Sequence, residues 1–278
     1  MEPRVTGDRC RPRDVALTMS EFQIIEENLR SAMRFFGQAT GSGEVRSLEG
    51  AIAMFSGLEY GVFNIALLTR GITSDNGSLE ARLAAAARYF KTRTLRWSFW
   101  LCEDLLDPPV RRRARQAFFD FGLRAISHPP GMFAPALLPS VRPLPAIECR
   151  RVADEATRKA FAEITTVAFE IPYTVAYAVY TPERAWKGDY QGFVGLVDGR
   201  PVAIVALVAA AGALGVYSLG TLPAYRRQGY GEGLLRAAVA EMQQRPGPLI
   251  LQSTEIGYSL YRRMGFRDAT KFTVYLTK

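Results

Sequence analysis

Apolar positions in the second half of the chain form short runs typical of strands, separated by helical patterns. Strands are predicted at 147–152, 192–197, 202–209, 214–220, 249–253 and 270–276. The pair Asp198-Gly199 is a strong hairpin signal between two of these runs. Helices are predicted from the cap Asp154 to Phe169, then up to Tyr180, and at 231–243 and 257–264.

The first half of the chain shows a similar order of patterns. It predicts a long amphipathic helix, two strands, a helix, a strand, a helix and a last extended segment, at 19–37, 45–56, 62–68, 79–90, 95–101, 110–121 and 132–138. Pro139, Pro143 and Pro145 then interrupt the pattern. We therefore expect two domains in tandem, 1–140 and 146–278, each with an α/β arrangement.

Composition excludes several classes of protein. With 48% hydrophobic and 22% charged residues the chain is typical of a globular protein, and no apolar run approaches the ~18 residues of a membrane span. The first residues contain no apolar signal core, which predicts a cytoplasmic location. Cys10, Cys102 and Cys149 are scattered and His128 is the one histidine, so we expect neither a disulfide framework nor a metal site.

The net charge of +8 is spread evenly along the chain. The part from Ala146 onward has 16 basic and 12 acidic residues and the part before it has 19 and 15, so each half carries +4. A protein that follows a nucleic-acid backbone concentrates its charge in a patch or tail. The even distribution favours a single site for an anionic cofactor over nucleic-acid binding.

The stretch from Tyr217 to Ala240 joins an apolar strand, a basic glycine-rich turn and an apolar helix without a break. Its centre reads Arg-Arg-Gln-Gly-Tyr-Gly, residues 226–231. The first N–H groups of a helix have no intrahelical partners and carry the positive end of the helix dipole. Glycines there allow a phosphate to approach the bare amides, so an anion site is one interpretation and a capped surface turn is the other.

This stretch resembles the pyrophosphate-binding motif of the GNAT N-acetyltransferase superfamily. That motif is Gln or Arg, two variable residues, Gly, any residue, then Gly or Ala, and Arg226, Gly229 and Gly231 fill its places. A second match lies about thirty residues further on, where 260–266 reads Leu-Tyr-Arg-Arg-Met-Gly-Phe, similar to the superfamily's Leu-Tyr, three variable residues, Gly-Phe. The resemblance implies the GNAT fold, with a mixed, mostly antiparallel sheet flanked by helices.

The resemblance also implies an acyltransferase that moves an acetyl group from acetyl-CoA directly to an amine, with no metal. Its strand would lend backbone groups to the acetyl and pantetheine arms, with Leu219 and Thr221 as contacts. The pyrophosphate would be held by the whole loop: Arg226, Arg227, Gln228, Gly229, Tyr230 and Gly231. Tyr261 would be the general acid that protonates the departing thiolate, and packing on a short helix is its alternative interpretation.

Several assignments remain open on the sequence. Tyr258 is a rival acid, and the base has only the weak candidates Glu170, Glu255, and waters held by Ser218 or Tyr217. Ser253 and Thr254 stand where many relatives carry an asparagine that contacts pantetheine. Other functions consistent with the loop are a CoA-binding sensor without turnover and a transferase of longer acyl chains or one that acts on peptides.

The first half repeats the predicted order of helices and strands, but it lacks both the glycine-rich motif and the tyrosine motif. Between the predicted strand 62–68 and the following helix it reads Thr-Arg-Gly-Ile-Thr-Ser-Asp-Asn-Gly-Ser, which contains no Arg-x-x-Gly-x-Gly. Phe118 occupies the position that corresponds to the tyrosine. We interpret this half as a degenerate GNAT-like domain that binds no cofactor.

Overall fold

The computed structural model describes residues 19–242 and 247–278. Its helices are α1 (Glu21–Ala39), α2 (Leu79–Lys91), α3 (Pro108–Asp120), α4 (Glu155–Phe169), α5 (Tyr173–Tyr180), α6 (Tyr230–Met242) and α7 (Glu255–Arg263). Its strands are β1 (Glu44–Leu48), β2 (Ala51–Phe55), β3 (Ile65–Leu68), β4 (Ser98–Cys102), β5 (Leu123–Ser127), β6 (Pro130–Ala134), β7 (Glu148–Arg151), β8 (Tyr190–Val197), β9 (Arg200–Ala210), β10 (Ala213–Thr221), β11 (Leu249–Gln252) and β12 (Arg267–Thr277). Cys10 lies outside the described residues.

All of these strands join one continuous sheet. Its order is β1-β2-β3-β4-β12-β6-β11-β10-β9-β8-β7, and β5 pairs with β12 beside this path. Two neighbouring pairs are parallel, β3 with β4 and β10 with β11, and the other pairings are antiparallel. The predicted mixed and mostly antiparallel sheet flanked by helices is confirmed.

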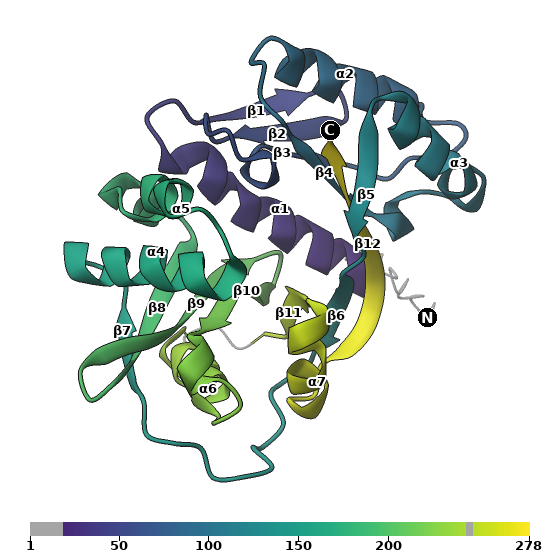
Figure 1. The fold of residues 1–278 in the computed structure, drawn as a ribbon. Coiled ribbons are helices and arrows are strands. Elements are labelled where there is room, and N and C mark those ends of the chain that lie inside the picture. Colours follow the sequence, from purple (N-terminus) through teal and green to yellow (C-terminus); the bar gives the residue numbers. More distant parts are fainter. Residues whose placement is uncertain (1–18, 243–246) are drawn as a thin grey trace, which may run out of the picture.

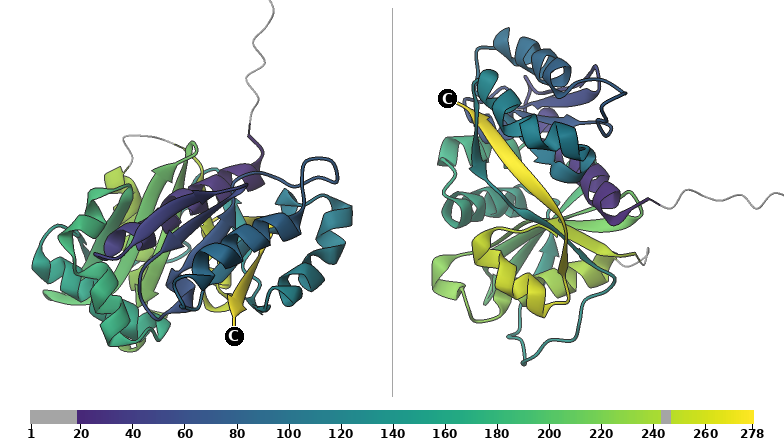
Figure 2. Two further views of the ribbon diagram at one scale, coloured as in Figure 1. Left: turned by 90° about the horizontal axis from the view of Figure 1, so that it is seen from above. Right: turned by 90° about the vertical axis from the view of Figure 1, so that its right-hand side faces the viewer.

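The two halves exchange strands at the centre of the sheet. β6, from the first half, lies between β11 and the start of β12, paired with both. The end of β12, in turn, lies between β4 and β5 of the first half. Figure 2 shows β12 crossing from one half of the molecule to the other. The predicted boundary therefore falls in the connection between β6 and β7, while sheet hydrogen bonds cross it in both directions.

Helix α1 adds a second tie between the halves. It lies across the sheet and contacts β2, β12 and β6 as well as β9 and β10. Its Asn28 is fully buried and donates from Nδ2 to the carbonyls of Val208, Ala210 and Ala213, at 3.1, 2.9 and 3.1 Å. A buried amide with all these partners fixes the end of the β9–β10 hairpin to the first half.

Both faces of the sheet are covered, which follows from the alternation of side chains along each strand. Along β9, Ile204, Ala206 and Val208 enter the core on the face of α1, α4 and α5, whereas Val205 and Leu207 enter the core beneath α6 and α7. The residues of β9 from 202 to 208 are buried, as expected for a strand with cover on both sides.

Two predictions for the first half are wrong in detail. The single strand predicted at 45–56 is a hairpin, β1–β2, because the chain reverses at Gly50, whose φ of +67° favours glycine. Strand β5 was not predicted, because only Leu123 of its residues is buried and its apolar pattern is weak. None of the helices in the described ranges has an apolar stretch long enough to cross a membrane.

Candidate functional site

Strands β10 and β11 begin side by side and then separate. Their parallel pairing is limited to Leu214 with Leu249 and Gly215 with Ile250. The register of β10 against β9 shifts between Tyr217 and Gly220, and Ser218 within this bulge has a φ of +49°. A bulge bends a strand and ends regular pairing. Beyond these two pairs, the backbone groups of β10 that face β11 therefore have no partner strand among the described residues.

The glycine-rich loop follows β10 and leads into α6. Arg227 and Gly229 both have left-handed backbones, with φ of +62° and +103°. Within the described residues, none of the N–H groups of residues 227–232 donates a hydrogen bond to a backbone or side-chain acceptor outside α6. The first N–H group of α6 that donates to a carbonyl of the loop is that of Gly233, which bonds the Gly229 carbonyl at 2.9 Å. Consecutive free N–H groups at a helix start form an anion-binding arrangement.

Two polar side chains of the loop, Arg226 and Gln228, donate to backbone carbonyls of the protein. The Nε of Arg226 donates to the carbonyl of Thr221 at 2.9 Å, and its Nη2 lies 3.5 Å from the carbonyl of Ala168. Gln228 donates to the carbonyl of Ala224 at 2.8 Å. The predicted contribution of the loop to anion binding therefore rests on its backbone and on the positive charge of its arginines.

Gly231 is the position where a side chain would disturb this arrangement most directly. A Cβ at residue 231 would lie 2.9 Å from Oγ1 of Thr221, the last residue of β10. Gly229 faces the connection between the two halves instead, where its Cβ would lie 3.0 Å from Cδ of Pro145. The sequence placed Thr221 and Gly231 in one site, and the structure brings them together. Leu219 packs at the edge of the core beneath α6 and α7.

The two candidate tyrosines of α7 have different environments. Tyr261 is buried in the core beneath α6 and α7, 5.7 Å from the Phe266 ring, and its hydroxyl donates to no described residue. Burial raises its pKa above the ordinary value of a phenol. Tyr258 donates its hydroxyl to Asp268 at 3.1 Å near the surface, and desolvation and this carboxylate raise its pKa. The Tyr258 hydroxyl therefore already has an acceptor, whereas the Tyr261 hydroxyl has none within residues 19–242 and 247–278.

The candidate bases are also distinguished by their contacts. The buried Tyr217 hydroxyl donates to Oδ1 of Asn28 at 2.7 Å, so it is committed to the tie between the halves. The Ser218 hydroxyl lies 2.8 Å from the Tyr190 hydroxyl. Glu170 ends α4 in a left-handed conformation and Glu255 lies in the first turn of α7, both exposed. Ser218 is therefore the candidate that lies within the bulge, and its hydroxyl faces that of Tyr190.

Ser253 and Thr254 have local structural roles. Thr254 caps α7 and accepts from the Gly257 N–H, while the Ser253 hydroxyl donates to the Thr254 carbonyl at 2.8 Å. These contacts provide no free amide of the kind that asparagine has at this place in many GNAT relatives.

The loop of the first half that corresponds to the glycine-rich loop is satisfied by the protein itself. The backbone N–H and the hydroxyl of Ser74 both donate to Oδ2 of Asp107 at 2.9 Å, and the N–H of Thr73 donates to Oδ1 of Asn76 at 2.8 Å. The N–H of Val110 and the donors of Ser74 hold the pKa of Asp107 below its ordinary value. An internal carboxylate thus occupies donors that an external anion would need.

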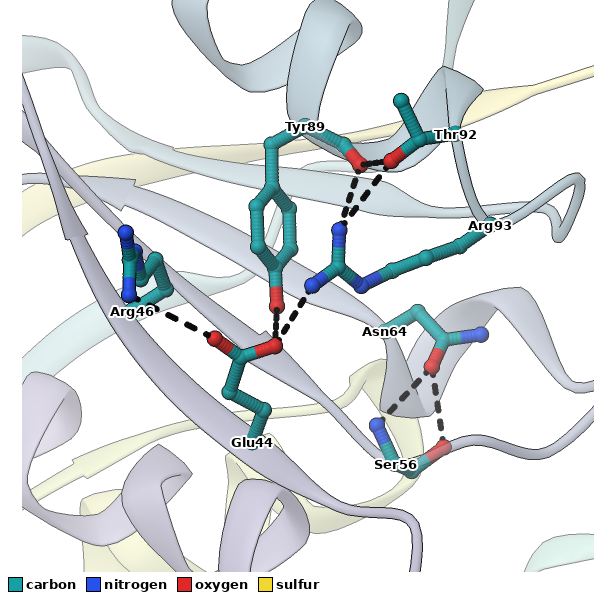
Figure 3. Close-up of polar contacts among 7 residues, drawn as sticks. All are labelled: Glu44, Arg46, Ser56, Asn64, Tyr89, Thr92 and Arg93. Atoms are coloured by element: carbon teal, nitrogen blue, oxygen red, sulfur yellow. Dashed lines mark hydrogen bonds and ion pairs between the residues drawn. The ribbon is translucent and has the colours of Figure 1, made fainter.

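A second polar cluster of the first half is likewise paired internally (Figure 3). Glu44 accepts from the Tyr89 hydroxyl at 3.1 Å and pairs with Arg93, whose guanidinium lies over the Tyr89 ring at 3.7 Å. Arg93 holds the pKa of Glu44 below its ordinary value. This cluster borders a surface hollow of about 690 Å³ between β1 and α2. Among the residues that the structure describes, no group of three metal-ligating side chains gathers anywhere.

Comparisons with known proteins agree with this geometry. Residues 188–268 match the family model described as an acetyltransferase (GNAT) domain. A GCN5-related N-acetyltransferase from Kribbella flavida superposes with a TM-score of 0.68 at 22% identity, over 93% of this chain and 96% of that one. Another from Sphaerobacter thermophilus gives 0.55 at 15% identity, over 82% and 76%. No curated protein matches the chain significantly. These likenesses confirm the expected fold.

Proposed function

On the premise that residues 188–268 form a GNAT acetyltransferase domain, we propose that the protein transfers an acetyl group from acetyl-CoA to an amine. The observation that carries the proposal is the run of free N–H groups at residues 227–232, next to the separated ends of β10 and β11. The residues present fit a pyrophosphate, because the loop offers bare amides, the positive end of the α6 dipole and two arginines that form no ion pair within the described residues.

The free edge of β10 would bind the pantetheine and acetyl arm through its backbone, with Leu219 and Thr221 as contacts. When bound, acetyl-CoA supplies an activated thioester that an amine attacks directly. The role of the protein is to position the two reactants and to provide a proton for the sulfur that leaves. No covalent bond to a protein side chain is required.

Tyr261 is the residue proposed to provide that proton. Burial keeps its phenol protonated at neutral pH, and its hydroxyl has no acceptor among the described residues that would compete for the proton. Its environment supports this role better than that of Tyr258, whose proton is directed to Asp268. Ser218 is the group of the bulge that can bind the attacking amine or a water next to it.

The test is a binding measurement followed by a turnover measurement on the full chain. We expect one acetyl-CoA per chain by native mass spectrometry, and release of free CoA in the presence of a panel of primary amines. Acetyl-CoA that binds and is never consumed across the panel would favour a CoA-binding sensor. Absence of binding would contradict both functions.

A further inference from the structure

The connection between β6 and β7 is bound to the second half along its length. The N–H of Leu138 donates to the carbonyl of Met264 at 2.9 Å, behind α7. The hydroxyl of Ser140 donates to the carbonyl of Arg142 at 2.8 Å and folds the connection on itself. Pro145 then packs on Gly229. Figure 1 shows the connection running along the lower side of the molecule, past α7 and α6. The connection therefore lies against one side of the glycine-rich loop.

Arg142 of this connection reaches the loop directly. Its Nη2 donates to the carbonyl of Arg227 at 3.1 Å and lies 3.6 Å from the position of a Gly229 Cβ. Arg227 is the non-glycine residue of the loop that has a left-handed backbone. The bond from Arg142 therefore gives the carbonyl of this residue a partner and uses none of the loop N–H groups. The other guanidinium donors of Arg142 have no acceptor among the described residues.

The loop and the connection beside it carry three arginines, Arg142, Arg226 and Arg227. Arg142 donates to the carbonyl of Arg227 and Arg226 to that of Thr221, and in the described part of the chain none of the three forms an ion pair. The acid nearest in sequence, Glu232, is buried and already paired with Arg236. Positive side chains without a carboxylate partner, next to the bare amides of a helix start, favour the binding of a phosphate.

We propose that Arg142 is a further anion-binding residue of this site, its guanidinium bridging the Arg227 carbonyl and a phosphate oxygen. The inference rests on the proposed function for the identity of the ligand. It makes the connection between the halves part of the cofactor site, although it lies outside the matched residues 188–268. The phosphate belongs either to the pyrophosphate or to the 3′-phosphate of CoA.

The test is calorimetry on the full chain with acetyl-CoA, 3′-dephospho-acetyl-CoA and inorganic pyrophosphate. Arg142→Ala should weaken acetyl-CoA binding by about tenfold or more, the usual effect of a lost hydrogen bond to a charged group. Arg142→Gln can still donate to the Arg227 carbonyl, and it should be equally weak because it lacks the charge. Arg112→Ala, an equal change of charge at an exposed position of α3, should bind like the wild type.

Equal weakening of both CoA forms and of pyrophosphate assigns the contact to the pyrophosphate, and weakening of acetyl-CoA alone assigns it to the 3′-phosphate. Full affinity in Arg142→Gln would show that the residue only holds the loop, and unchanged affinities in Arg142→Ala would equally overturn the inference. If the wild type binds pyrophosphate in an Arg142-dependent way and does not bind acetyl-CoA, the proposed function fails and this inference stands. A wild type that binds none of the three contradicts both.

Discussion

Each half contains two parallel strands that pair at only two positions and then separate, and among the described residues only the first half fills the space beyond with its own hydrogen bonds. In the first half β3 pairs with β4 at Ile65–Ser98 and Ala66–Phe99, as few positions as in β10 and β11. Beyond these pairs the protein closes the gap itself. Ile72 donates to the Leu105 carbonyl at 2.7 Å, and Asp107 donates to the Ile72 carbonyl at 3.1 Å.

Helix α1 completes the closure of the first half. Arg30 donates to the carbonyl of Leu68 at the end of β3, at 3.3 Å, and pairs with the buried Glu26 at 3.4 Å. In the second half, by contrast, α1 contacts β10 before the bulge, where Asn28 accepts from the Tyr217 hydroxyl. Beyond the bulge, β10 continues into the glycine-rich loop. On the proposed function, the comparison indicates that topology alone is not sufficient for a cofactor site. The strand ends and loop amides would also have to lack internal partners.

The largest expected effect concerns the separation of the halves. A fragment of residues 146–278 lacks β6, so β11 and β12 lose their shared neighbour, and it also lacks α1. We expect no soluble folded monomer by circular dichroism and size-exclusion chromatography, and recovery when residues 1–145 are co-expressed. A soluble fragment with full acetyltransferase activity would show that the exchanged strands are dispensable.

Gly231→Val should abolish acetyl-CoA binding while the chain remains folded. The side chain would meet Thr221 at 2.9 Å and cover the free amides. Native mass spectrometry should count one acetyl-CoA on the wild type and none on the variant. Gly188→Ala is a control at a glycine with an ordinary contact of 3.7 Å. A second acetyl-CoA on the wild type would mean that the closed opening of the first half also binds the cofactor.

Glu26→Gln probes the closure of the first half through pH. Burial, which outweighs the attraction of Arg30, raises the pKa of Glu26 to about 7 from 4.5. Between these two pH values the folded chain keeps a proton that the unfolded chain has released. The contribution of this proton to the free energy of unfolding is full below pH 4.5 and is lost as the pH rises through about 7. It amounts to about 3 kcal/mol.

Urea unfolding at pH 4 and pH 8 measures this contribution. In Glu26→Gln the loss of stability between the two pH values should be smaller than in the wild type by about that amount, whereas the exposed neighbour variant Glu27→Gln should keep the wild-type dependence. Identical pH dependence in Glu26→Gln and the wild type would show that Glu26 is ionised in the folded chain.

Tyr261→Phe should lower kcat by about 10² with little change in acetyl-CoA affinity, the usual span for loss of a general acid. Stability should be nearly unchanged, since the hydroxyl donates to no described residue. Tyr258→Phe removes the bond to Asp268 and should have the smallest effect on kcat. The reverse ranking of the two variants would assign the acid to Tyr258.

Most elements of the fold could be predicted from local patterns. The hairpin at Asp198-Gly199 and the capped helix after Asp154 are encoded by neighbouring residues, and both lie where expected. The exchange of β6 and β12 could not be predicted in this way. Alternation along a strand gives its faces and says nothing about which distant strand it pairs with.

The candidate site was predicted from local residues only. Gly229 and Gly231 were predicted because glycine marks a close approach of backbone, and Gly229 has a left-handed φ in the structure. Arg142 was not predicted, because its contact with Arg227 depends on a long connection folding back onto the loop. The choice between Tyr261 and Tyr258 depends on the partner Asp268, which lies on another strand.

Strand β12 also constrains how the protein is made. It follows every other described element along the chain, yet it pairs at the centre of the sheet, where Thr270 meets Cys102, 168 residues earlier. Until β12 has emerged from the ribosome, the edges of β4 and β5 that pair with it remain unpaired, and the sheet of the first half is incomplete. Such late, distant pairing slows folding and exposes strand edges to aggregation. Chaperones that bind nascent chains should therefore act on this protein at least until β12 has been synthesised.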